Sequence, residues 1–505
     1  MYNVGFDNGK YLSEQSEEIL KRIERFGNKL YLEFGGKILY DYHAARVLPG
    51  FDPNVKMRLL KGLKEKASMI LCIYAGDIER KKMRADFGIT YDSDAMKLID
   101  DVRDWGLEIS AVVITRYEGQ PSASQFKKKL ERRGVNVYTH GFTKGYPTNV
   151  DLIASEEGYG ANPYIETNKP LVVVTGPGPN SGKLATCLSQ IYHEHKRGIH
   201  AGYAKFETFP IWSIPLKHPV NVAYEAATAD LNDVNLIDPF HLEAYNEKAV
   251  NYNRDIQAFP VLKRILDRVM EGGSCYASPT EMGVNRAGFG IVDDEVVREA
   301  AKQEIIRRYF QYKCEYAIGY ATKSTVERAE LLMKEVGSSP EDRTVVAPTR
   351  EAAFEAEKSE GKGDNGFYCG AAIELPDGRI VTGKNSPLMH SASSLIMNAI
   401  KIMADIPDKL HLLPPNIIES ISELKREIVS QKSVSLSLDE TLIALSISAT
   451  SNPAAQCAME QLKYLRGCDV HMTHIPTPGD QSGLRRLGVR MTSDPQFASK
   501  SLFVS

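Results

Sequence analysis

The sequence of 505 residues lacks several features that would narrow its class at once. Its seven cysteines are an odd number with no Cys-x-x-Cys pair, which argues against a disulfide framework. No run approaches the ~18 apolar residues of a membrane span, and the N-terminus carries no signal-peptide pattern. The net charge of −3 gives no sign of general nucleic-acid binding. We therefore expect a soluble, cytoplasmic protein with no membrane partner.

The composition is that of a globular chain, with 43% hydrophobic and 25% charged residues. At about 150 residues per domain, roughly three domains are expected. Residues 1–238 alternate apolar runs with helical patterns, which predicts an α/β domain of three layers with a mostly parallel sheet. The predicted strands are 30–34, 68–75, 109–115, 135–139, 171–175 and 199–206, and the predicted helices are 13–27, 54–66, 91–105 and 124–134.

Residues 239–340 have long amphipathic patterns and predict a helical middle domain, in which Pro260 breaks or kinks a helix. Residues 341–505 predict a C-terminal α+β domain, with 341–366 partly a linker. Within it, Pro376-Asp377-Gly378 predicts a hairpin. Helical patterns cover 391–405, 415–430 and 453–466, and a short strand begins at Cys468.

The most informative segment is an apolar strand, 171–175, followed by a glycine-rich stretch and a helical pattern. The first amides of a helix have no intrahelical partner and the helix dipole makes that end positive, so a phosphate there receives several N–H bonds. Glycines let the backbone approach, and a lysine adds charge. We expect a P-loop-like turn whose nucleotide-binding residues are Gly176, Gly178, Asn180, Ser181, Gly182, Lys183 and Leu184.

The match to the phosphate-binding motif G-x-x-x-x-G-K-[ST] is incomplete. Pro177 stands where the first glycine belongs, and Leu184 replaces the hydroxyl that binds Mg²⁺. Thr186 or Ser181 would have to supply that hydroxyl. The alternative without a function is a tight strand-to-helix connection with an exposed lysine.

A second interpretation treats Gly176, Gly178 and Gly182 as a stretched dinucleotide fingerprint. The next predicted strand ends at Glu207, where an acid that binds ribose would stand. This interpretation predicts an oxidoreductase that uses NAD or NADP.

Phosphoryl transfer also needs an acid that binds the metal. Asp77 directly follows the apolar run ILCIYAG and is the first candidate; Asp230 is the second. A solvated loop acid or a helix cap is the alternative for both.

Gly35 and Gly36 end another early strand, where consecutive glycines permit close approach of a ligand. Asp41, His43 and Arg46 then supply a carboxylate, an imidazole and an anion-binding guanidinium. This segment is a candidate acceptor site, with a locally packed turn as the alternative.

The C-terminal region offers weaker candidates. Cys468, His471 and His474 suggest metal ligands, but residues three apart on a strand face opposite sides, so we expect no metal site there. His390 supplies a base without a visible partner, and residues 474–486 form a polar loop.

Four long segments resemble a known family. They are YLEFGGKILYDYHAARVLPGF, VVVTGPGPNSGKLATCLSQIYHE, YAKFETFPIWSIPLKHPVNVAYEAATADL and THIPTPGDQSGLRRLGV. Together they are similar to the bacterial family with domain of unknown function 1846, an uncharacterised protein family, over essentially the whole chain. The resemblance implies a bacterial cytosolic protein with an α/β N-terminal part, a helical insert and an α/β C-terminal domain, and it implies no reaction.

Our leading hypothesis is an enzyme that binds ATP or another NTP with Mg²⁺, as a phosphotransferase or NTP-driven ligase on a small molecule. In it, residues 176–183 hold the phosphates, Asp77 or Asp230 binds Mg²⁺, and 35–46 shapes the acceptor site. The NAD(P)-dependent oxidoreductase is the second hypothesis. The third is a non-catalytic scaffold or regulatory protein whose charged helices at 240–337 bind a partner. The middle domain is also a candidate surface for homo-oligomerisation.

Overall fold

The computed structural model describes residues 4–84, 88–270, 273, 275–429 and 433–500. The chain divides into two compact units, Tyr2–Ala301 and Lys302–Ser505. Residues 239–301, which the sequence placed in a separate helical domain, belong to the first unit. Helical patterns dominate this segment of the sequence, and the strands between them are too short to leave a signal of their own.

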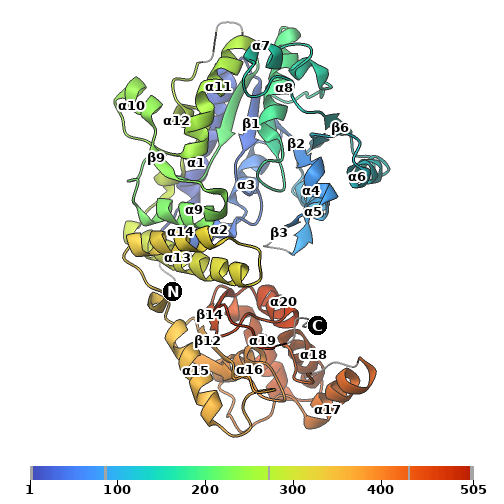
Figure 1. Cartoon of the computed structure of the whole chain (residues 1–505), viewed down its shortest axis with the longest axis vertical. Helices are drawn as coiled ribbons and strands as arrows, with labels where there is room; N and C mark the ends of the chain where they lie inside the picture. The colour runs from blue at the N-terminus through green and yellow to red at the C-terminus, as the bar shows by residue number, and fades with distance from the viewer. Residues whose placement is uncertain (1–3, 85–87, 271–272, 274, 430–432, 501–505) are drawn as a thin grey trace. The chain divides into compact units, whose positions relative to one another are not determined.

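A parallel sheet of seven strands forms the centre of the first unit, in the order β11-β8-β1-β7-β2-β5-β6 (Figure 1). The predicted α/β class and parallel sheet are therefore confirmed. The central strand, β7, was recognisable because its five residues are all buried. The strands are β1 (Leu30–Phe34), β2 (Ala67–Tyr74), β5 (Ile109–Thr115), β6 (Val137–His140), β7 (Leu171–Thr175), β8 (Gly202–Phe206) and β11 (Gly283–Val284).

Helices cover the sheet. α8 packs against β1, β7 and β8 through an apolar face that includes Cys187, Leu188 and Ile191. α5 packs against β2 and β5. The helices up to α9 are α1 (Asn8–Arg25), α2 (Tyr42–Val47), α3 (Val55–Gly62), α4 (Ala75–Glu79), α5 (Tyr91–Asp104), α6 (Pro121–Glu131), α7 (Val150–Ile153), α8 (Lys183–Lys196) and α9 (Pro219–Ala227), and the small ribbon beside α5 is β3 (Met83–Arg84) with β4 (Ile89–Thr90).

Residues 239–301 complete this unit. β11 extends the sheet beside β8, and α11 packs against α8 and α7. Pro260 lies inside α11 and does not end it; its side chain is exposed, so water can reach the carbonyl that loses its donor. The elements are β9 (Asn235–Ile237), α10 (Pro239–Tyr245), β10 (Val250–Tyr252), α11 (Asn253–Val269) and α12 (Pro279–Met282).

The second unit contains a sheet of four strands in the order β13-β12-β14-β15. β12 (Gly370–Glu374) and β13 (Ile380–Lys384) form the predicted hairpin, closed by the amide of Gly378 on the carbonyl of Leu375. β14 (Asp469–Met472) and β15 (Arg490–Ser493) pair in parallel. The helices are α14 (Lys323–Glu335), α15 (Val346–Lys358), α16 (Ser391–Met403), α17 (Pro415–Glu423), α18 (Leu438–Ala449), α19 (Pro453–Gln461) and α20 (Pro478–Leu487), and α13 (Asp294–Ala317) spans the boundary between the units.

Two segments of the second unit differ from their predictions. Much of the expected linker at 341–366 is α15, which packs against β12. The expected polar loop at 474–486 contains α20, which begins at Pro478 with Thr477 as its N-cap. A cap followed by proline is a helix start, and the glycines that follow concealed it.

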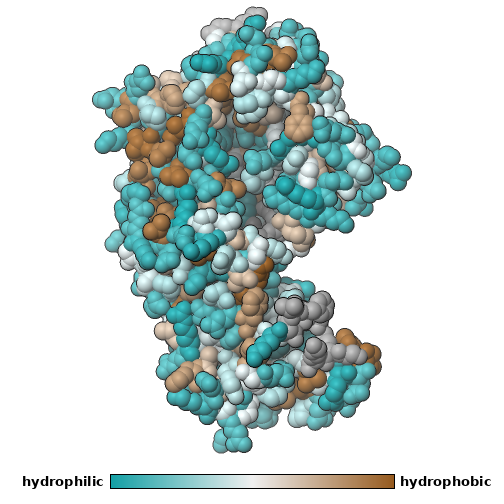
Figure 2. All heavy atoms as spheres, in the orientation of Figure 1, coloured by the Kyte–Doolittle hydropathy of each residue, from teal (hydrophilic) through white to brown (hydrophobic). Residues whose placement is uncertain are grey.

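The surface is mostly hydrophilic on the face shown in Figure 2. Exposed apolar side chains gather over β9 and α10, where Leu236, Leu242 and Tyr245 are each more than a third exposed. Within the described ranges, no helix is both long enough and apolar enough to cross a membrane.

The place of residues 239–301 can be tested by truncation. A fragment of residues 2–301 should melt cooperatively, followed by circular dichroism. A fragment of residues 2–238 should not, because it loses β11 and α11, whose Ile265, Leu266 and Val284 are buried. A cooperative transition of the shorter fragment at the temperature of the longer one would contradict this assignment.

Candidate functional site

The candidate residues of the first unit gather at the carboxyl ends of the parallel strands. The chain leaves β7 toward β8 and leaves β2 toward β5, so connections depart in opposite directions from two neighbouring strands. The same reversal occurs between β1 and β8. Ligands of open α/β sheets bind at such switch points. The glycine-rich loop follows β7, Asp77 follows β2, and Gly35 and Glu207 follow β1 and β8.

The loop 176–182 is tightly packed. A Cβ at Gly176 would lie 2.4 Å from the carbonyl oxygen of Cys72, and a Cβ at Gly178 would lie 2.6 Å from the hydroxyl oxygen of Tyr91. Gly182 has a φ of +90° and is the N-cap of α8, where no side chain caps the helix. The glycines are therefore required by close packing and by a left-handed turn.

Strand β5 holds the far side of the loop. The Thr115 hydroxyl donates to the carbonyl of Ser181 at 2.8 Å. Its side chain would lie 2.6 Å from a Cβ at Gly182. The Arg116 guanidinium donates to the carbonyl of Asn180. These contacts fix the loop against two different strands, β2 and β5.

Two cations lie on the loop without a carboxylate partner. Lys183 Nζ donates to the carbonyl of Gly178 at 3.2 Å and approaches Ser181 Oγ at 3.4 Å. Among the described residues, neither Lys183 nor Arg116 forms an ion pair with an acidic side chain. The buried hydroxyl of Thr175, directly before the loop, also has no hydrogen-bond partner there. Unbalanced positive charge at an uncapped helix N-terminus favours an anion.

Asp77 lies close to the loop but is already paired. Its carboxylate is 2% exposed, accepts from Arg80 and lies 4.0 Å from Lys82 Nζ. The Lys82 ammonium is 4.9 Å from the centroid of the Tyr91 ring, which contacts the loop at Gly178. A metal ion at Asp77 would have to displace these cations.

The hydroxyl candidates differ in accessibility. Thr186 is fully buried and its hydroxyl accepts from the Cys72 thiol at 3.4 Å, whereas Leu184 is half-buried and has no hydroxyl. Ser181 is buried beside Lys183. Across the described residues, no group of three or more His, Cys, Asp or Glu side chains is arranged to hold a metal ion.

The predicted acceptor segment follows β1. A Cβ at Gly35 would lie 2.8 Å from the carbonyl oxygen of Phe206, and Gly36 has a φ of +70°. Asp41 caps α2 and pairs with the buried Lys56 at 2.7 Å. Burial alone would raise the pKa of Asp41, but the Lys56 ammonium holds that pKa below its ordinary value.

His43 and Arg46 are both half-buried in α2. The His43 ring lies edge-on to Phe209, with 5.4 Å between ring centroids. Phe209 follows β8 shortly after Glu207. The structure thus brings the segment 35–46 to the switch point between β1 and β8.

A buried cluster of charges stands at the same point. Lys205 pairs with Glu207 at 3.0 Å and with Asp255, and it also donates to the Tyr252 hydroxyl. Burial, reinforced by the neighbouring Asp255 carboxylate and only partly offset by Lys205, raises the pKa of Glu207 to about 8. Carboxyl groups with raised pKa values are common in active sites.

Other candidates lie away from this edge. Asp230 is exposed in a short 3₁₀ turn, Ala229–Leu231, after α9. In the second unit, His471 is buried and bonds to the Thr492 hydroxyl at 2.8 Å, while His474 bonds to the Thr473 hydroxyl. Cys468 is buried just before β14. His390 contacts Asp480 at 2.8 Å, a partner that the sequence did not reveal.

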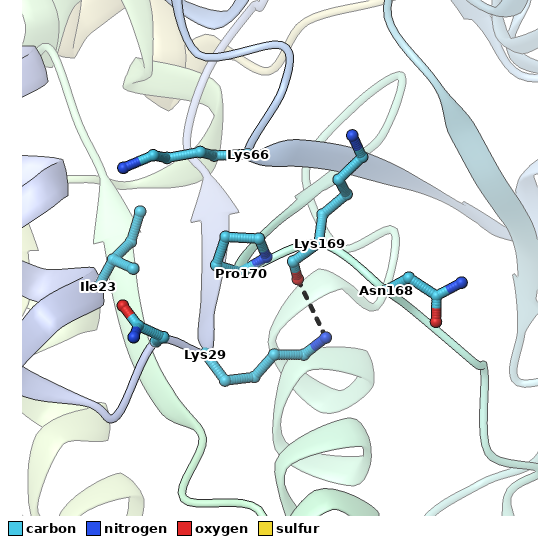
Figure 3. A pocket seen from close by; sticks show the side chains of 7 residues that line it. Ile23, Lys29, Lys66, Asn168, Lys169 and Pro170 are labelled. Atoms are coloured by element: carbon cyan, nitrogen blue, oxygen red, sulfur yellow. Dashed lines mark hydrogen bonds between the residues drawn. The ribbon is translucent and has the colours of Figure 1, made fainter.

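An open pocket of about 420 Å³ lies at the opposite edge of the sheet, before β1, β2 and β7 (Figure 3). Lys29, Lys66 and Lys169 line it. Lys29 Nζ donates to the Thr167 carbonyl at 2.7 Å and to the Lys169 carbonyl at 3.1 Å, so its ammonium is satisfied within the protein. The carboxyl edge, where Lys183 and Arg116 meet the glycine-rich loop, is the candidate site that we consider further.

Sequence reasoning missed Arg116, Lys205 and Asp255. Arg116 follows a strand just as Asp77 does, so the position that selected Asp77 could have selected it. Lys205 is a charged residue inside an apolar strand, which is itself a signal of a buried ion pair. Nothing in the sequence indicated Asp255, because it lies on α11, about 50 residues away from Lys205 along the chain, and only the fold brings the two together.

The raised pKa of Glu207 predicts a pH dependence of stability. Folded Glu207 keeps its proton up to about pH 8, whereas an unfolded glutamate loses it near pH 4.3. The folded state therefore binds more protons between these values, and the free energy of unfolding should fall as pH rises from about 5 to 8. Urea unfolding at pH 5.5 and 8.0 should show a smaller fall for Glu207→Gln than for wild type. An equal fall in the free energy of unfolding of both proteins would contradict the raised pKa of Glu207.

Comparison with known proteins assigns nearly the whole chain to one family. Residues 4–337 match the domain of unknown function DUF1846, N-terminal, and residues 341–503 match its C-terminal counterpart. A UPF0371 protein of Clostridium tetani is 57% identical over 500 residues, covering 99% of each chain. UPF0371 proteins of Clostridium botulinum strains Eklund 17B and Langeland are 58% identical over the same share. The chain therefore belongs to the DUF1846 family, also called UPF0371.

Proposed function

We propose that the first unit binds the phosphates of a nucleoside triphosphate at the loop 176–183 and transfers a phosphoryl group to, or activates, a small molecule. The observation that carries this proposal is the charge on the loop. Lys183 and Arg116 have only loop oxygens and an aromatic ring as partners among the described residues. Positive charge beside an uncapped helix N-terminus favours an anion at that point.

The backbone supports the same ligand. Because Gly182 leaves α8 without a side-chain cap, the first amides of that helix have no carboxylate or hydroxyl partner among the residues that the structure describes. A phosphate at this point would accept hydrogen bonds from those amides and from the Lys183 ammonium. The sequence departs from the usual motif only in the residues before Gly182 and at Leu184.

The acceptor half would lie at the neighbouring switch point. β1 separates β7 from β8, so the loop and Glu207 are about 10 Å apart across the sheet. A terminal phosphate on the loop and a small acceptor beside His43, Lys205 and Glu207 would span this distance. Glu207, with its raised pKa, would exchange a proton with the acceptor.

The arrangement supports a dinucleotide less well. In the fingerprint unit, the acid that binds ribose ends the strand adjacent to the glycine strand. Here β1 intervenes between β7 and β8, and Glu207 is engaged by Lys205. The order of the strands therefore favours phosphoryl transfer over hydride transfer.

Isothermal titration of ATP with Mg²⁺ tests the proposal. Lys183→Ala should weaken binding by about 10-fold or more, because it removes a charge-assisted hydrogen bond to phosphate. Lys196→Ala is the matched control at the other end of α8, where the lysine is exposed and pairs with Glu156. The control should bind as wild type does.

Equal affinity of the Lys183 and Lys196 variants, or no binding by wild type, would refute the proposal. A rise in melting temperature with NAD or NADP, and none with ATP, would instead favour the oxidoreductase.

A further inference from the structure

We propose that Arg116 is a second phosphate ligand and that the site takes a ligand with at least two linked phosphates, with Lys183 on one phosphate and Arg116 on the next. This inference rests on the proposed function and adds the chemical class of the ligand. Arg116 follows β5, whereas Lys183 begins α8 after β7, and both donate into the same loop. The two cations therefore approach the loop from separate strands of the sheet.

The backbone of Arg116 supports a functional role. Its φ is +50°, in the left-handed region that a residue with a side chain rarely adopts. Nothing in the turn needs arginine for that conformation, since glycine or asparagine would adopt it more easily. Backbone strain of this kind concentrates at ligand sites. Arginine therefore stands at a position where glycine would fit the backbone more easily.

The side chain is held ready but not neutralised. Its guanidinium carbon lies 3.5 Å from the centroid of the Tyr74 ring, and it donates to the Asn180 carbonyl. Neither partner carries a formal charge. By contrast, the neighbouring Arg80 pairs with the Asp77 carboxylate. A guanidinium has five donors in a planar fork that suits phosphate, so Arg116 has donors to spare for a ligand.

Two cations favour a polyphosphate over a single phosphate. Lys183 reaches Gly178 and Ser181, whereas Arg116 reaches Asn180 between them in sequence. If a single phosphate binds the first amides of α8, the Arg116 guanidinium keeps its hydrogen bond to the Asn180 carbonyl. A second, linked phosphate gives Arg116 a charged partner in place of a neutral one, which strengthens the bond.

The experiment compares inorganic phosphate with pyrophosphate, and AMP with ATP, by isothermal titration. Arg116→Gly is the main variant, because glycine suits a φ of +50° and the loop should keep its fold, as checked by thermal melting. Arg116→Lys keeps the charge and loses the fork. Arg133→Ala, at an exposed arginine after α6, is the control.

We expect wild type and the control to prefer pyrophosphate over phosphate, and ATP over AMP, by about 10-fold or more. Arg116→Gly should bind the monophosphates as wild type does and lose most of that preference, with Arg116→Lys between the two. An unchanged preference in Arg116→Gly, while Lys183→Ala still loses binding, would overturn the inference and leave the proposed function standing. No phosphate binding by wild type would overturn both.

Discussion

The turn from β7 into α8 is the constraint on which the site depends. The chain must pass from a buried central strand to a covering helix between the Cys72 carbonyl on one side and Thr115 on the other. Only glycine fits at 176 and 182, and at 182 the left-handed backbone also leaves the helix without a capping side chain. The uncapped amides are therefore a consequence of packing, and no side chain in the described part of the chain caps them.

Charge at the edge of the sheet follows from that turn. Three acids nearby lie against cations of the chain: Asp77 against Arg80, Asp41 against Lys56, and Glu207 against Lys205. Lys183 and Arg116 are left facing loop carbonyls. Among the described residues this edge therefore holds two cations without a carboxylate partner, and our proposal of a polyanionic ligand rests on that arrangement.

Local patterns predicted what depends on local physics. The runs at 30–34, 109–115 and 171–175 are strands with those bounds because continuous apolar residues fit a sheet buried on both faces. The strand order, which puts β7 at the centre, could not be predicted, since pairing between distant segments leaves no mark in a single sequence. For the same reason, the Lys205–Asp255 pair and the contact of Arg116 with Asn180 could not be predicted from the sequence. The segment Gly176 to Lys183 could be recognised as a tight turn between a strand and a helix, because the close packing that forms the turn also requires its glycines.

The claim that matters most is that phosphate binds to the amides at the start of α8. Hydrogen–deuterium exchange measured by mass spectrometry, with and without saturating ATP and Mg²⁺, addresses it directly. We expect slower exchange in peptides that cover 174–186, with a smaller effect at 115–117. Unchanged exchange across 174–186, or protection confined to the second unit, would contradict it.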